Sequence, residues 1–104
     1  MTLDSIKQKW EKHEATSFPL GHRSKEVLGK SLTIWDSEIG GSVLTFLNTG
    51  GHYGARQYSM MAQARAAMPK ILDELEGEAK DYFQQLADLV EEIMAIAKNP
   101  EETG

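Results

Sequence analysis

Residues 72–96 have the sequence LDELEGEAKDYFQQLADLVEEIMAI, which carries the longest regular pattern in the chain. Its apolar side chains recur at steps that alternate between three and four residues, as they do along one face of a helix. These positions are Leu72, Leu75, Ala79, Tyr82, Leu86, Leu89, Ile93 and Ile96. Such a spacing over more than three heptads is typical of a coiled-coil seam. We therefore predict a long C-terminal helix over residues 69–98, which ends before Asn99-Pro100.

The length of this helix predicts self-association. A helix of about 30 residues is about 45 Å long at 1.5 Å per residue. A compact body of about 100 residues has a radius of gyration near 13 Å, so the rest of so small a domain can hardly cover it. We therefore expect the eight seam residues to form the interface of a homodimer, the commonest symmetric oligomer. The alternative is that the same stripe packs on the domain's own core.

Residues 53–67 predict a further helix ahead of the long one. They are rich in alanine, and larger side chains such as Tyr58 and Met61 recur at helical spacing. Pro69 follows them. A proline costs about 3 kcal/mol inside a helix but suits the first turn of a new one. We therefore place a joint or a sharp kink at Met68-Pro69.

The N-terminal half predicts a short helix followed by a small sheet. Leu3, Ile6 and Trp10 follow the helical period. Residues 31–36 and 42–47 are rich in β-branched and aromatic side chains and are separated by two glycines, which is typical of an antiparallel hairpin. Val27-Leu28, with Gly29-Lys30 as the turn, can add a third strand and give a three-stranded meander.

Within that hairpin, Trp35 is predicted to lie on the exposed face. Successive side chains of a strand point to opposite faces, so only one of Ile34 and Trp35 can lie in the core. Exposed aromatic side chains are enriched where partners bind. Trp35 is therefore a candidate contact residue for a partner.

Together these elements predict one α+β domain over residues 1–104. A helix and a small sheet occupy residues 1–52, a helical part occupies residues 53–98, and residues 99–104 form a disordered tail. The composition agrees with a soluble globular protein, because 40% of the residues are hydrophobic and 26% are charged. Cysteine is absent, and no apolar run approaches the roughly 20 residues that a membrane span needs. We expect a cytoplasmic location and no contact with membranes.

The charge of the chain argues against direct binding of DNA or RNA. The formal net charge is −5, and the acidic side chains are concentrated in the long C-terminal helix. Nucleic-acid binders usually carry a basic stripe instead.

The stretch NTGGHYGAR at residues 48–56 is the one candidate for an anion site. A glycine-rich turn before a helix can point backbone N–H groups at an anion, so Gly50, Gly51 and Arg56 could hold one. The spacing matches neither the P-loop nor the dinucleotide fingerprint. The glycines are therefore expected to form a turn between a strand and a helix, without binding an anion.

No other residues indicate a catalytic or metal-binding site. The three histidines, His13, His22 and His52, belong to no metal-binding spacing, and no serine lies in a nucleophile elbow. We predict no enzyme activity, no cofactor and no metal.

Two segments resemble small proteins encoded by phages and prophages, including the Ead-like early-region family. They are LDSIKQKWEKHEAT at residues 3–16 and AQARAAMPKILDELEGE at residues 62–78. Phe18-Pro19 stands where a Gly-Pro-Trp is common in such proteins. The resemblance implies an accessory protein in the cytoplasm of a bacterial host, and it supplies no catalytic residues.

The sequence thus predicts a non-enzymatic protein that binds a host or phage protein, as a homodimer. Two alternatives stay open. One is an acidic anti-defence inhibitor, anti-CRISPR-like or a nucleic-acid mimic. The other is a binder of a small anionic ligand through the Gly50-Gly51 loop.

Overall fold

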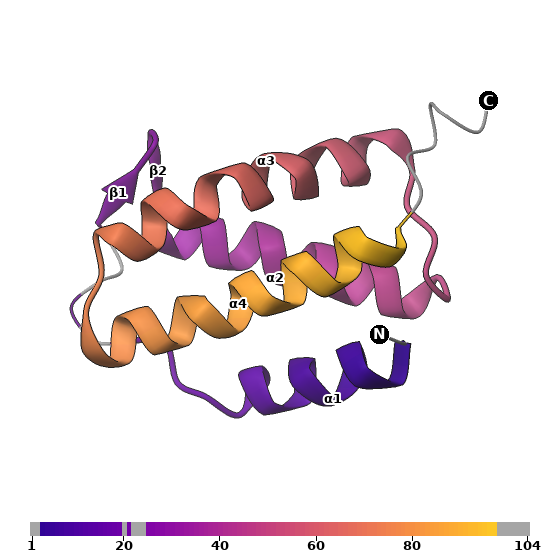
Figure 1. Ribbon diagram of the computed structural model, residues 1–104, viewed down its shortest axis with the longest axis horizontal. Helices are drawn as coiled ribbons and strands as arrows, with labels where there is room; N and C mark the ends of the chain where they lie inside the picture. The colour runs from indigo at the N-terminus through magenta and orange to yellow at the C-terminus, as the bar shows by residue number, and fades with distance from the viewer. Residues whose placement is uncertain (1–2, 20, 22–24, 98–104) are drawn as a thin grey trace.

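The computed structural model describes residues 3–19, 21 and 25–97, which form four helices and a two-stranded antiparallel sheet (Figure 1). In chain order the elements are α1 Leu3–Glu14, β1 Glu26–Val27, β2 Lys30–Ser31, α2 Leu32–Asn48, α3 Ala55–Asp73 and α4 Gly77–Ile96. The protein is therefore mostly helical, and the predicted α+β class holds only in the loose sense of a small sheet beside helices. His22 and the tail at residues 99–104 lie outside the described residues.

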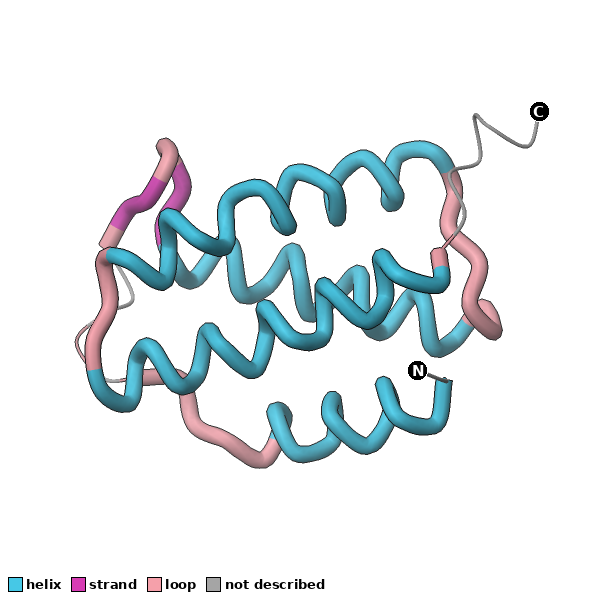
Figure 2. The backbone as a smooth tube through the Cα atoms, in the orientation of Figure 1, coloured by secondary structure: helices cyan, strands magenta, loops and turns pink. Residues whose placement is uncertain are grey.

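The four helices lie side by side, and their connections gather at the two ends of the body (Figure 2). α4 lies at the centre and contacts α1, α2 and α3. Its buried side chains face all three neighbours, and Phe83, Leu86, Leu89 and Ile93 are fully buried. The hydrophobic core is thus built around α4.

The predicted dimer seam lies largely inside this core. Leu75, Ala79, Tyr82, Leu86, Leu89 and Ile93 are buried within the chain, whereas Leu72 is half-buried and Ile96 is 37% exposed. α4 has 20 residues, hence a length of about 30 Å, and the body measures 43 Å along its longest axis. A helix of this length needs no second copy to cover it. Homodimerisation stays a prediction, but the argument from helix length no longer supports it.

The helical part divides at a different place from the predicted one. Pro69 lies inside α3, which continues to Asp73, so the predicted joint at Met68-Pro69 is wrong. The chain turns at residues 74–76 instead, and Gly77 has a φ of 59°. Glycine adopts this left-handed conformation without a steric cost. The break therefore falls at the glycine, and the proline is accommodated at the expense of one backbone hydrogen bond.

Residues 31–36 and 42–47 form no hairpin, because Ser31 ends β2 and residues 32–36 and 42–47 belong to α2. The Ser31 hydroxyl accepts a hydrogen bond from the Ile34 N–H at 3.2 Å and so caps the helix. The buried apolar residues of the helix then follow a spacing of three and four: Leu32, Trp35, Ile39, Val43 and Phe46. Burial of this face against α1, α3 and α4 outweighs the preference of the individual residues for strands.

The glycines at positions 40 and 41, predicted to form the hairpin turn, lie in the middle of α2. A Cβ atom at Gly40 would stand 3.0 Å from the Cη2 atom of Trp10 on α1, a distance that real Cβ contacts rarely reach. Gly40 therefore allows the Trp10 ring to pack directly against the α2 backbone. Its role is close packing of two helices.

The sheet consists of β1 and β2, with Glu26 paired to Ser31 and Val27 paired to Lys30. Trp35 holds this hairpin to α2. Its indole N–H donates to the Val27 carbonyl at 2.9 Å, and the Lys30 ammonium lies 4.4 Å from the centre of its ring. Trp35 is only 4% exposed. The prediction that Trp35 is an exposed partner contact is therefore wrong.

The hairpin turn contains an unusual residue. Leu28 and Gly29 have φ angles of 53° and 82°, the conformation of a type I′ turn. A leucine with positive φ is strained, and Leu28 is also 61% exposed. The leucine therefore contributes strain and little burial.

Leu28→Asn is expected to stabilise the protein by about 0.5–1 kcal/mol, because Asn-Gly is the preferred pair for this turn. The midpoint of urea denaturation measures the change. Glu26→Gln, on the exposed face of the neighbouring strand, is the control and should leave the midpoint unchanged. A lower midpoint for Leu28→Asn would show that the leucine makes a stabilising contact.

Candidate functional site

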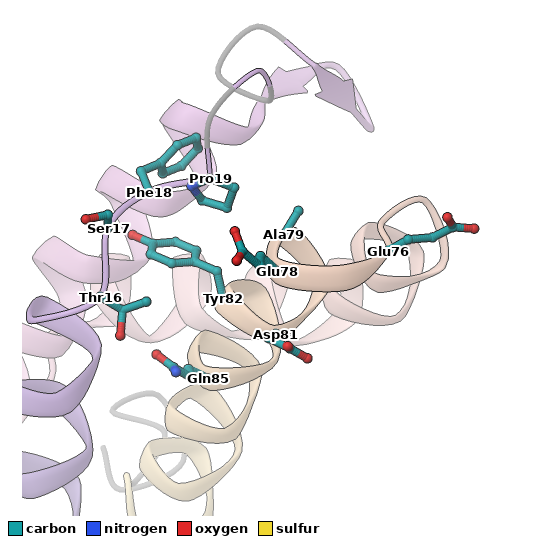
Figure 3. Close-up of a pocket in the computed structure, with 10 residues that line it drawn as sticks. All are labelled: Thr16, Ser17, Phe18, Pro19, Glu76, Glu78, Ala79, Asp81, Tyr82 and Gln85. Atoms are coloured by element: carbon teal, nitrogen blue, oxygen red, sulfur yellow. The ribbon is translucent and has the colours of Figure 1, made fainter.

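The candidate site is a cleft at the end of the bundle where the segment after α1 passes the start of α4 (Figure 3). Its volume is about 610 Å³. The residues that line it are Thr16, Ser17, Phe18, Pro19, Glu76, Glu78, Ala79, Asp81, Tyr82 and Gln85. Two segments that are far apart in the sequence thus form its two walls.

The first wall is fixed by the C-terminal end of α1 and by one aromatic ring. The Thr16 N–H donates to the His13 carbonyl at 3.0 Å, and the Thr16 hydroxyl donates to the Lys12 carbonyl at 3.0 Å. Phe18 then packs edge-on against Tyr82 of α4, with ring centres 5.3 Å apart. This contact holds the segment at residues 16–19 beside α4.

The second wall makes the cleft acidic. Glu76, Glu78 and Asp81 are exposed, and none of the described residues that line the cleft is lysine or arginine. In Figure 3 Glu78 lies on the side of Tyr82 and Pro19, while Glu76 and Asp81 point away from them. Carboxylates at the start of a helix also interact favourably with its dipole. Glu78, in the first turn, therefore stabilises α4, and the three carboxylates together give the cleft its negative charge.

A buried polar cluster supports the cleft from behind. The Tyr82 hydroxyl donates to Asp36 Oδ1 of α2 at 2.8 Å. The His13 ring of α1 is 3% exposed and stacks on Tyr82 with ring centres 4.4 Å apart. Its Nδ1 atom forms a hydrogen bond of 2.9 Å with Gln85 Oε1, and its Nε2 atom lies 3.7 Å from Asp36 Oδ1. Three helices thus fix the orientation of Tyr82.

This cluster was not predicted from the sequence. His13 belongs to no motif, and its neighbours Asp36, Tyr82 and Gln85 come from two other helices. Asp36 was assigned to a strand, so its proximity to α1 and α4 could not be foreseen. A weak signal exists in hindsight, because His13 lies at i+3 from Trp10 and i+7 from Ile6 on the apolar face of α1.

Tyr82 makes stability depend on pH. Burial raises the pKa of its hydroxyl above the usual 10.0, and the hydrogen bond to Asp36 and the charge of Asp36 raise it further. Because the pKa is higher in the folded state, the contribution to stability is complete below about pH 10 and is lost as the pH rises above that value.

We expect Asp36→Asn to lower the pKa of the Tyr82 hydroxyl, because the substitution removes the negative charge beside it. NMR of ¹³C-labelled tyrosine measures this change. Tyr53 is the internal control: burial raises its pKa too, but its hydroxyl donates to the Ser42 carbonyl, so its titration should not move. Equal shifts for the two tyrosines would mean that the substitution loosens the whole fold.

The geometry does not favour an anion site at the glycine loop. The Gly50 N–H donates to the Leu47 carbonyl at 3.3 Å, and the Gly51 N–H donates to the Phe46 carbonyl at 2.8 Å. Both glycines have positive φ, so they close the C-terminal end of α2. Their amides are therefore engaged within the chain.

Arg56 lies apart from the two glycines. It lines a polar groove of about 420 Å³ between α2 and α3, and neither Gly50 nor Gly51 lines that groove. The three residues of the predicted anion site are thus not brought into one cleft.

Comparisons of the chain with protein-family models, with curated proteins and with solved structures gave no match. The resemblance to phage and prophage proteins therefore stays a prediction from two sequence segments. In the part of the chain that the structure describes, every helix falls short of the length or the apolar character needed to cross a membrane. The same part contains no group of three or more histidine or acidic side chains suited to a metal ion.

Proposed function

We propose that this protein is a non-enzymatic binding protein, and that its acidic cleft receives a lysine or arginine side chain of a partner protein. The observation that carries the proposal is the composition of the cleft. The Glu78 carboxylate lies on the side of Tyr82 and Pro19, and Glu76 and Asp81 add negative charge to the lining of the same cleft. A cation in the cleft gains ion pairing with these carboxylates and cation–π attraction to the half-buried Phe18 ring.

The cleft is organised before a partner arrives. Tyr82 is held by Asp36 and by the His13 ring, and Phe18 is packed against Tyr82 and Phe83. A preformed site loses less conformational entropy on binding. The volume of about 610 Å³ lies in the usual range for a site that encloses a small group.

The two resembling segments suggest the setting. We place the protein among phage or prophage accessory proteins that act in a bacterial cytoplasm, where a host or phage protein would supply the cationic side chain. An acidic inhibitor of a nucleic-acid-binding enzyme is a special case of the same chemistry. Its partner would present several basic residues in place of one.

A fluorescein-labelled peptide of alternating glycine and arginine tests the cleft by fluorescence anisotropy at about 0.15 M salt. Glu78→Lys should weaken binding by about tenfold, because it places a cation in the cleft. The matched control is Asp73→Lys, which makes the same change in net charge at an exposed residue outside the cleft. If the two variants lose the same affinity, the peptide senses only net charge and the cleft is not the site.

A further inference from the structure

A second groove runs between α1 and α2, separate from the acidic cleft. Its volume is about 430 Å³, and its apolar lining consists of Leu3 and Trp10 from α1 and Leu44 and Leu47 from α2. None of its lining residues belongs to the acidic cleft. The groove and the acidic cleft are therefore two separate sites.

The groove follows the axes of the two helices. Leu3, Lys7, Trp10 and Glu14 line it at successive turns of α1, the spacing of one helix face. The floor is firm, because the Trp10 ring packs directly on the α2 backbone at Gly40. Leu44, one turn beyond Gly40, is 42% exposed. The open apolar surface of the groove thus comes from Leu44 and from the half-buried Leu3 and Leu47, beside the charged Lys7 and Glu14.

The borders of the groove are acidic. Asp4, Glu11 and Glu14 stand against the single Lys7 among its charged lining residues, a net charge of −2. Trp10 also carries an unpaired hydrogen-bond donor in the interior of the protein. The indole N–H of Trp10 has no acceptor among the described residues, although Trp10 is only 9% exposed. A buried donor without a partner destabilises the free protein.

We propose that this groove binds an amphipathic helix of another protein, with leucine-like side chains on one face and basic side chains at its borders. A groove between two helices that both contribute apolar residues to its lining matches the helix-in-groove mode of recognition. The acidic border selects basic residues by charge complementarity.

The acidic border also argues against a second copy of this chain as the occupant. In a twofold contact the same patch faces itself, so a lining with a net charge of −2 would meet an identical lining. Like charges across an interface oppose association.

The probe is a fluorescein-labelled peptide of about four helical turns, with the sequence LKKLLKLLKKLLKL. Its binding is followed by fluorescence anisotropy at about 0.15 M salt. Leu44→Glu should weaken binding by about tenfold, because it removes the exposed apolar contact. Ile34→Glu is the matched control: it makes the same change on the same helix, at a residue that is 48% exposed and lies outside the groove.

The sign of the effect distinguishes docking from general attraction of a cationic peptide. Both variants add one negative charge, so unspecific attraction predicts slightly tighter binding for both. The groove predicts weaker binding for Leu44→Glu and no loss for Ile34→Glu. Unchanged or tighter binding of Leu44→Glu, with its circular dichroism spectrum intact, would overturn the proposal.

A second variant acts on charge alone. Glu11→Lys should also weaken binding, and by more than Glu78→Lys, which makes the same change of charge in the acidic cleft. Loss of binding in Glu78→Lys, with Glu11→Lys unaffected, would place the peptide in the cleft and refute the groove. The measurements can thus refute the proposed groove without refuting the proposed cleft, and the reverse.

Discussion

Replacing Leu86 with lysine is expected to unfold the protein. Leu86 is fully buried at the centre of α4, and a charged ammonium at this position would have no partner and no access to water. Burying an unpaired charge costs several kcal/mol, which is comparable with the total stability of about 5–15 kcal/mol that a domain has. The far-UV circular dichroism signal of α-helix should be largely lost at 25 °C.

The matched control for this experiment is Gln84→Lys. Gln84 lies on the exposed side of the same helix and bonds Asp88 one turn later, an interaction that lysine can replace. This variant should keep the helical signal and the thermal midpoint of the parent. A coiled-coil seam makes a different prediction, because Leu86→Lys would then leave a folded monomer of 11.6 kDa. Light scattering on a helical Leu86→Lys variant would reveal that outcome.

Replacing Trp35 with alanine should lower the free energy of unfolding by about 3–5 kcal/mol, as is usual for a large buried aromatic residue. The substitution leaves a cavity between α2 and the hairpin. It also removes the hydrogen bond to the Val27 carbonyl and the ring that faces the Lys30 ammonium. Urea denaturation followed by circular dichroism measures the loss.

Two further variants separate the loss of the hydrogen bond from the loss of the buried ring. Trp35→Phe keeps most of the ring and loses the hydrogen bond, so the loss should be about 1–3 kcal/mol. Ile34→Ala changes the neighbouring side chain, which is 48% exposed, and should alter stability by less than about 1 kcal/mol. If Trp35→Ala were as mild as Ile34→Ala, the tryptophan would be a surface residue after all.

The sequence predicted best where one face of a helix is apolar. The stripe of α4 and the helix that contains Ile6 and Trp10 were both correctly assigned, because burial enforces their spacing. α2 was missed although Leu32, Trp35, Ile39, Val43 and Phe46 follow the same period. Its β-branched residues and its glycine pair favoured a hairpin. Position 40 needs a glycine because the Trp10 ring packs against the backbone there. Trp10 lies about 30 positions away in the chain, so no local pattern reveals this contact.

The wrong position of the helix break at Pro69 also led to the prediction of a homodimer. Because a proline usually ends a helix, the sequence predicts a break at Pro69. The predicted last helix is therefore longer than α4. The true break depends on the left-handed conformation of Gly77. The excess length then suggested a second copy. Six of the eight predicted interface residues instead lie in the core of the chain itself.

The candidate cleft could be predicted only in part. The acids at the start of α4 are visible in the sequence as a charged face. The packing of three helices decides that these acids lie in one cleft with Phe18. It also decides that His13 and Asp36 contact Tyr82. No local pattern encodes that arrangement.

A ¹H–¹⁵N NMR titration with the glycine–arginine peptide shows whether the acidic cleft binds a cationic side chain. The chemical shift changes should be concentrated at residues 16–19 and 76–85 and should be absent in the Glu78→Lys variant. Shift changes spread over the acidic residues of the whole surface, or unchanged in Glu78→Lys, would contradict the proposed function.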